Sequence, residues 1–141
     1  MQSWAWLFVA LAMFVGAIGR EVYHFATSDN RPPVAFSRVE VLNSPINAGG
    51  TLQIRVWREK VRDDCPVVSR PFITDENGET LDLLDVFSIG GPAGTEFYDA
   101  TYLVPIDLHP GSYELFDLLS YRCPNDEFVI PQPTARFVVA P

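Results

Sequence analysis

Few residues in this chain have the types and spacing that catalysis or metal binding requires. The two histidines, His24 and His109, are far apart, and neither lies at ligand spacing from Cys65 or Cys123. Structural zinc sites take nitrogen and sulfur ligands at short intervals, and catalytic nucleophiles need a neighbouring base. No nucleophile motif, histidine pair or phosphate-binding glycine loop occurs in the sequence. We therefore expect no catalytic residue, no metal site and no cofactor, and a chain that is not an enzyme.

Two pairs of acidic residues each lie beside a cysteine, and they are candidates for binding a partner. They are Asp63 with Asp64, and Asp126 with Glu127. Clustered carboxylates can hold calcium through their oxygens, but this spacing matches no calcium loop. We expect a solvated acidic rim in preference to a cation site.

The two cysteines, Cys65 and Cys123, form an even count in a small chain behind an apolar leader. That pattern predicts one disulfide and an oxidising compartment, with two unpaired thiols as the alternative. A bridge across this separation would stabilise the fold by up to roughly 4 kcal/mol on the chain-entropy view.

Trp57 departs from the pattern of its own segment. Leu52, Ile54 and Val56 alternate with polar residues, which predicts a strand with one buried face, and Trp57 falls on the other face. An outward tryptophan suits a sugar or a protein partner. The alternative is that the stalk or a neighbouring strand edge covers it.

Residues 1–19 carry no charged side chain, and their centre is almost wholly apolar. As a helix this stretch would be about 28 Å long, close to the hydrocarbon thickness of a bilayer. We interpret residues 1–20 as a transmembrane anchor, with Trp4 and Trp6 at one interface and Arg20 and Tyr23 at the other. A cleaved signal peptide is the alternative, and residues 21–33 are predicted to be a polar, proline-rich stalk.

From residue 34 onward the hydrophobic period changes to two, and turn residues recur throughout the segment. Residues 34–141 are therefore predicted to form an all-β, immunoglobulin-like antiparallel β-sandwich of about seven strands, preceded by one apolar helix. In that order the loops holding the two cysteines lie at the same pole. A long strand should run from Ser112 to Arg122, with a bulge or bend near Asp117, and Asp117 should pair with an arginine such as Arg55 or Arg122.

The stretch Leu108-His-Pro-Gly-Ser-Tyr113 resembles the turn before the sixth strand of fibronectin type III and related sandwiches. The resemblance implies a tyrosine corner built from Leu108, Pro110, Gly111 and Tyr113, with the tyrosine ring in the core and its hydroxyl bonded to nearby backbone. The order of anchor, Gly-Gly-Thr-Leu-Gln-Ile, Cys-Pro, Pro-Gly-Ser-Tyr and Tyr-Arg-Cys is also similar to small uncharacterised proteins of tailed bacteriophages. That second resemblance implies no activity.

The net charge argues against nucleic-acid binding. At −8 the chain lacks the basic surface that nucleic-acid binding requires. We expect a membrane-tethered envelope protein that crosses the cell membrane once through residues 1–20. Its periplasmic or extracellular domain would contact a protein partner or further copies of itself. The alternatives are a viral structural or decoration protein located in the virion, whose apolar helix packs in an assembly, and a carbohydrate-binding module.

Overall fold

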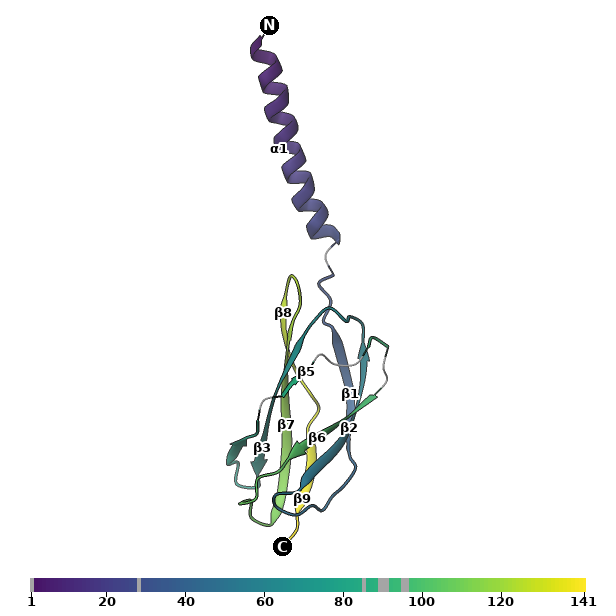
Figure 1. Ribbon diagram of the computed structural model, residues 1–141, viewed down its shortest axis with the longest axis vertical. Helices are drawn as coiled ribbons and strands as arrows, with labels where there is room; N and C mark the ends of the chain where they lie inside the picture. The colour runs from purple at the N-terminus through teal and green to yellow at the C-terminus, as the bar shows by residue number, and fades with distance from the viewer. Residues whose placement is uncertain (1, 28, 85, 89–91, 95–96) are drawn as a thin grey trace. The chain divides into compact units, whose positions relative to one another are not determined.

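The computed structural model describes residues 2–27, 29–84, 86–88, 92–94 and 97–141. The chain divides into two compact units, residues 1–31 and residues 32–141. The first unit consists mainly of helix α1 (Gln2–Thr27), and the second contains the strands (Figure 1).

Helix α1 continues past the predicted anchor and through the first residues of the predicted stalk, to Thr27. Residues 21–27 contain neither proline nor glycine, so nothing ends the helix before the Pro32-Pro33 pair approaches. Every described side chain from Phe8 to Tyr23 is exposed, and most of them are apolar. No helix among the described residues is both long enough and apolar enough to cross a membrane.

The second unit is an antiparallel β-sandwich, as predicted. One layer is a three-stranded sheet in the order β1-β2-β6. Its strands are β1 (Val34–Val41), β2 (Thr51–Lys60) and β6 (Phe97–Leu103). The pairing of β1 with β2 shifts register between Phe36 and Arg38, whereas β2 and β6 pair without interruption.

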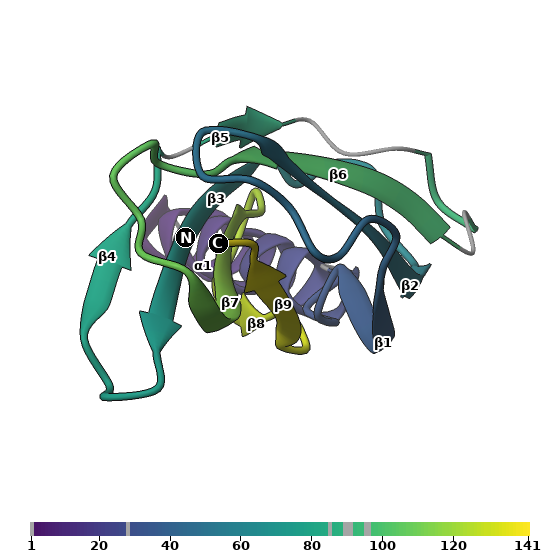
Figure 2. The same ribbon diagram turned by 90° about the horizontal axis from the view of Figure 1, so that it is seen from below.

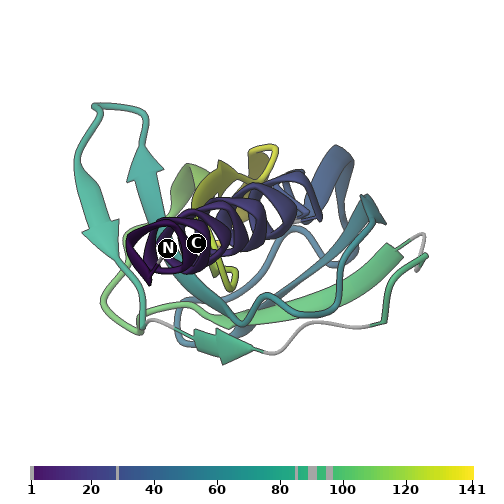
Figure 3. The same cartoon turned by 90° about the horizontal axis from the view of Figure 1, so that it is seen from above.

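The other layer is a six-stranded sheet in the order β4-β3-β7-β8, with β5 also paired to β3 and β9 also paired to β7. Its strands are β3 (Val67–Asp75), β4 (Thr80–Asp82), β5 (Val86–Ser88), β7 (Gly111–Arg122), β8 (Glu127–Pro131) and β9 (Ala135–Val139). Consecutive strands β2 and β3 lie in different sheets, as they do in immunoglobulin-like folds. Figures 2 and 3 view the sandwich from its two ends, with β6 next to β2.

The described strands outnumber the predicted seven because of two strands that were not predicted, the three-residue β5 beside β3 and the five-residue β8 before β9. β8 pairs with the second half of β7 and β9 with its first half. Of the bulge or bend predicted near Asp117, the bulge is wrong, because β7 pairs with β3 in unbroken register from Tyr113 to Tyr121. The irregularity lies in the segment that pairs with the other side of β7. There Gln132, between β8 and β9, donates its backbone N–H to the carbonyl of Asp117.

Two apolar clusters fill the space between the sheets. The larger cluster is formed by residues of both sheets, including Leu52, Ile54, Leu115 and Phe137. The smaller one comprises Val34, Cys65, Val67, Leu119, Tyr121 and Cys123. Along β7, Leu115 belongs to the first cluster and Leu119 to the second, so the residue between them on the same face, Asp117, marks the boundary.

Candidate interaction surfaces

The predicted disulfide is confirmed: Cys65 and Cys123 are bonded, with an S–S distance of 2.09 Å and a Cα–Cα distance of 4.3 Å. Cys65 precedes β3 and Cys123 follows β7, and these two strands are hydrogen-bonded neighbours. Both cysteines are buried in the smaller cluster. The bridge therefore joins the two loops at one end of the β3–β7 pair, as the predicted strand order requires, and it is buried in the core.

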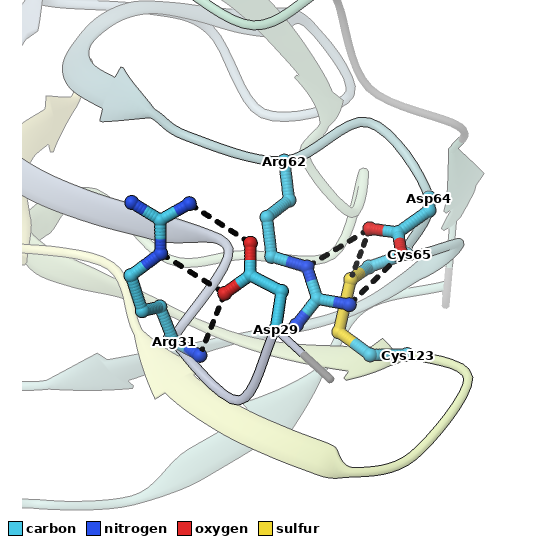
Figure 4. Close-up of polar contacts among 6 residues, drawn as sticks. All are labelled: Asp29, Arg31, Arg62, Asp64, Cys65 and Cys123. Carbon is cyan, nitrogen blue, oxygen red and sulfur yellow. Dashed lines mark hydrogen bonds and ion pairs between the residues drawn. A yellow bond between two sulfur atoms is a disulfide. The ribbon is translucent and has the colours of Figure 1, made fainter. Parts of the chain in front are cut away.

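The acidic residues beside the disulfide are exposed, and two of them pair with cations of their own segment. Arg62 donates two hydrogen bonds to the carboxylate of Asp64, from Nε at 2.9 Å and from Nη2 at 2.8 Å (Figure 4). Lys60 Nζ lies 3.4 Å from Asp63 Oδ1. In the N-terminal unit, the Arg31 guanidinium pairs with Asp29 in the same bidentate way.

Asp126 lies in the turn after β7, and Glu127 begins β8. The backbone N–H of Cys123 donates to the carbonyl of Asp126, which closes this turn at 2.8 Å. Among the described residues, no three His, Cys, Asp or Glu side chains gather as a metal site would need. All four acidic residues are exposed, two just before Cys65 and two shortly after Cys123, and their use by a partner stays a prediction.

Three buried cations, two on β2 and one just after it, were not predicted from the sequence. Arg58, Lys60 and Arg62 are only 7%, 4% and 6% exposed, and the first two continue the inward face that Leu52, Ile54 and Val56 begin. The guanidinium of Arg58 lies 4.7 Å from the ring centre of Tyr98, and its Nε and Nη2 have no hydrogen-bond partner among the described residues. The period-two pattern contains this signal, because it assigns these residues to the inward face whatever their charge.

Asp117, which is 3% exposed, accepts hydrogen bonds from two buried hydroxyl groups. Ser69 Oγ lies 2.8 and 2.7 Å from its carboxylate oxygens, and the Tyr102 hydroxyl lies 2.7 Å from Oδ2. The Tyr98 hydroxyl donates to Gln132 Oε1 at 2.8 Å. We call Ser69, Tyr98, Tyr102, Asp117 and Gln132 the polar layer, since they separate the two apolar clusters.

Burial raises the pKa of the three tyrosine hydroxyls that lie in or beside this layer. The pKa of Tyr98 and of Tyr102 rises, chiefly through desolvation and further through the charge of Asp117. Desolvation raises the pKa of Tyr121 to about 12, although the Arg58 charge acts in the opposite direction. These hydroxyls are therefore protonated throughout the physiological pH range.

The predicted ion pair between Asp117 and Arg55 is wrong. Arg55 lies on the outer face of β2 and donates to Asp99 of β6, from Nε at 2.7 Å and from Nη2 at 2.9 Å. Hydrogen bonding in this pair lowers the pKa of Asp99 and raises that of Arg55. Strand parity explains the error, because odd and even positions of β2 face opposite sides of the sheet.

Trp57 lies on the same outer face and is half-buried. The Arg38 guanidinium stands 3.8 Å from the centre of its ring, and the Phe97 ring lies 6.1 Å away at 48°. Arg55 stands 4.5 Å above the Phe97 ring. We call Arg38, Trp57, Phe97 and Arg55 the aromatic–arginine row. Since Arg38 covers one face of the indole, that face is not open to stacking on a sugar.

At the Pro-Gly turn, the Tyr113 hydroxyl donates to the carbonyl of His109 at 2.8 Å, and its ring stacks on Phe137 at 5.8 Å. Leu108 packs against the larger cluster. A hollow of about 450 Å³ opens beside this corner, lined by Ser44, Thr74, Asp75, Glu76, Ser112, Tyr113, Glu114, Arg136, Phe137 and Val138. Its charged residues include Arg136 and Glu114, 3.7 Å apart at their closest described contact.

Comparisons with known proteins support the fold alone. No family model matches the chain, and no curated protein matches it. The crystal structure of the C-terminal domain of wzt is similar, with a TM-score of 0.53 at 15% identity over 79% of this chain and 75% of that one. The match to a conjugative transposon lipoprotein from Bacteroides eggerthii DSM 20697 covers 76% of this chain and 98% of that one at 16% identity. Its TM-score of 0.37 is too low to show a shared fold. The likeness to bacteriophage proteins remains without support.

Proposed function

We propose that this chain is a non-enzymatic envelope protein: an extracytoplasmic β-sandwich, tethered by its N-terminal helix, that acts by binding another protein. The observation that carries the proposal is the closed disulfide between Cys65 and Cys123. Disulfides of this kind persist in oxidising compartments and are rare where thiols are kept reduced. The strand-bearing unit therefore belongs on the periplasmic or extracellular side of the cell membrane.

The tether is supported by the surface of helix α1. Phe8, Leu11, Met13, Phe14 and Val22 are all exposed, and exposed apolar surface of this extent usually meets lipid or protein. Attachment of this helix to the membrane accounts for its exposed apolar side chains.

The aromatic–arginine row supports the binding role. Tryptophan and arginine are enriched among the residues that dominate protein interfaces, where their flat groups bury large areas. Trp57 and Phe97 are already in contact, and Arg38 and Arg55 lie over their rings, so the row is ordered before any partner arrives. A preordered surface loses less side-chain entropy on binding.

The compartment can be tested by the redox state of the full chain in cells. Unreduced protein is denatured and treated with a maleimide that adds mass to each thiol, with a Cys65→Ser/Cys123→Ser variant as the unlabelled standard. We expect no mass shift unless a reductant is added first. Labelling of both cysteines without reductant would contradict the extracytoplasmic assignment.

The tether can be tested separately by washing membranes with carbonate. Native chain should stay in the pellet, a Phe14→Lys variant should be released, and Ser3→Lys near the end of the helix should behave like the native chain. A lysine at the middle of an inserted helix costs about 3 kcal/mol, whereas one near its end can reach water. Release of the native chain would refute the tether, and its recovery with particles would favour the viral structural alternative.

A further inference from the structure

Strand β6 leaves one edge of the three-stranded sheet open. It pairs with β2 along its whole length and with no other described strand. Its outward side chains are Phe97, Asp99, Thr101 and Leu103, and the apolar pair is 43% and 66% exposed. An unprotected edge with exposed apolar side chains is a template for another strand.

The other described edges carry features that discourage strand addition. β1 is interrupted by a register shift between Phe36 and Arg38, next to outward charges. β4 and β5 are three residues each, β8 ends at Pro131, and β9 is bridged on its other side by Ile46. Bulges, charges, prolines and short length are common means of protecting sheet edges. β6 has a regular register and contains none of these beyond Asp99, whose charge is paired with Arg55.

The side chains of β6 are complementary to those of a second β6 running antiparallel. With Ala100 opposite Ala100 of the second copy, Phe97 faces Leu103 at both ends, and Asp99 faces Thr101 on both sides of the centre. Opposite residues in antiparallel strands have Cβ atoms roughly 5 Å apart, so these are apolar contacts and hydroxyl-to-carboxylate hydrogen bonds. All outward residues of the strand find a suitable partner in this register.

The neighbouring registers are worse. Centring the pair on Asp99 would place two carboxylates directly opposite each other, which destabilises a sheet. Centring it on Thr101 would place Asp99 opposite the apolar Leu103 and leave Phe97 beyond the end of the paired strand. The sequence of β6 thus selects one alignment.

We propose that two copies of this chain associate through their β6 edges in the Ala100-centred register, joining two three-stranded sheets into one continuous sheet. The dimer rests on the proposed function in that it names a partner for a protein that acts by protein contacts. It would also extend the outer face that carries the aromatic–arginine row across the two-fold axis.

The dimer can be tested by sedimentation equilibrium of the full chain in neutral detergent micelles. In the dimer, Thr101→Asp places a carboxylate opposite Asp99 of the other copy at two symmetric positions. The repulsion should raise the dissociation constant about tenfold. Thr101→Lys places a cation there and should lower it by a similar factor. Thr80→Asp makes the same chemical change on the exposed strand β4 and should change nothing.

Amide hydrogen exchange gives a second measurement that does not depend on a variant. The amides of β6 that point away from β2 should exchange more slowly at concentrations above the dissociation constant than below it. A chain that stays monomeric at high concentration overturns the proposal. Association that neither Thr101 substitution changes also overturns it, and would assign the association to helix α1 instead of β6. A monomer that still resists carbonate leaves the proposed function standing without the dimer.

Discussion

Asp117 is the residue on which most of the buried polar contacts converge. Replacing it by alanine leaves the Ser69 and Tyr102 hydroxyls without their acceptor. Each unsatisfied buried group costs about 1–3 kcal/mol, so Asp117→Ala should lower the free energy of unfolding by about 3 kcal/mol. Asp117→Asn keeps one acceptor oxygen and should cost less. Urea denaturation measures both.

Tyr102→Phe is the matched control for that series, because it removes one donor and leaves the carboxylate bonded to Ser69. It should cost about 1 kcal/mol. If Asp117→Ala were as stable as the native chain, the polar layer would contribute nothing to folding.

At single positions, the sequence predicted which face of the sheet a residue occupies better than it predicted which residue it contacts. Alternation placed Tyr113, Leu115, Leu119 and Tyr121 on one face of β7, and this set lies inward. The pairing of Asp117 was not predictable from its own strand, because its hydroxyl donors come from β3 and β6, far away in the sequence. Contacts between strands depend on the order of strands in the sheets, which no local pattern specifies.

Among the elements, β3 and β7 are the pair that the disulfide holds together. Removing it by Cys65→Ala/Cys123→Ala should lower the free energy of unfolding by about 2–4 kcal/mol, because the unfolded chain regains the freedom of the closed loop. Chemical denaturation of the variant measures this loss. Reduction of native protein should give a similar loss, and an unchanged midpoint in both cases would mean that the bridge adds no stability.

Long strands with clear alternation, such as β2 and β6, were predictable, as were the short strands β4 and β9, which follow turn-rich segments. β5 was not predicted, because its three residues are too few for a period to show. β8 was missed because Pro131 and Pro133 flank it, and prolines usually argue against a strand. Because β7 is long and regular, β8 and β9 can each pair with it over only a few residues, on either side of Gln132.

For the molecule as a whole, stability should fall steeply in alkali. An unfolded tyrosine has a pKa near 10, whereas burial raises that of Tyr121 to about 12. The neutral hydroxyl is therefore favoured by the fold, and this stabilisation is fully present below about pH 10 and lost as pH rises from there through the folded pKa. Tyr98 and Tyr102 shift in the same direction.

Unfolding free energies measured from pH 9 to 12 should show this fall, with tyrosinate absorbance appearing as the chain unfolds. Each buried tyrosine adds up to roughly 1.4 kcal/mol per pH unit, so Tyr121→Phe should give a shallower slope. Equal slopes for the native chain and this variant would show that Tyr121 titrates normally in the folded protein.

The division of the interior by Ser69, Tyr102, Asp117 and their neighbours has a consequence for motion. Among the described residues only Phe36 packs against both clusters, so opening the smaller cluster leaves most contacts of the larger one in place. Proteins often open in such sub-global units at a fraction of their total unfolding free energy. The disulfide between Cys65 and Cys123 lies in the smaller cluster, so it opposes local opening of that part of the domain.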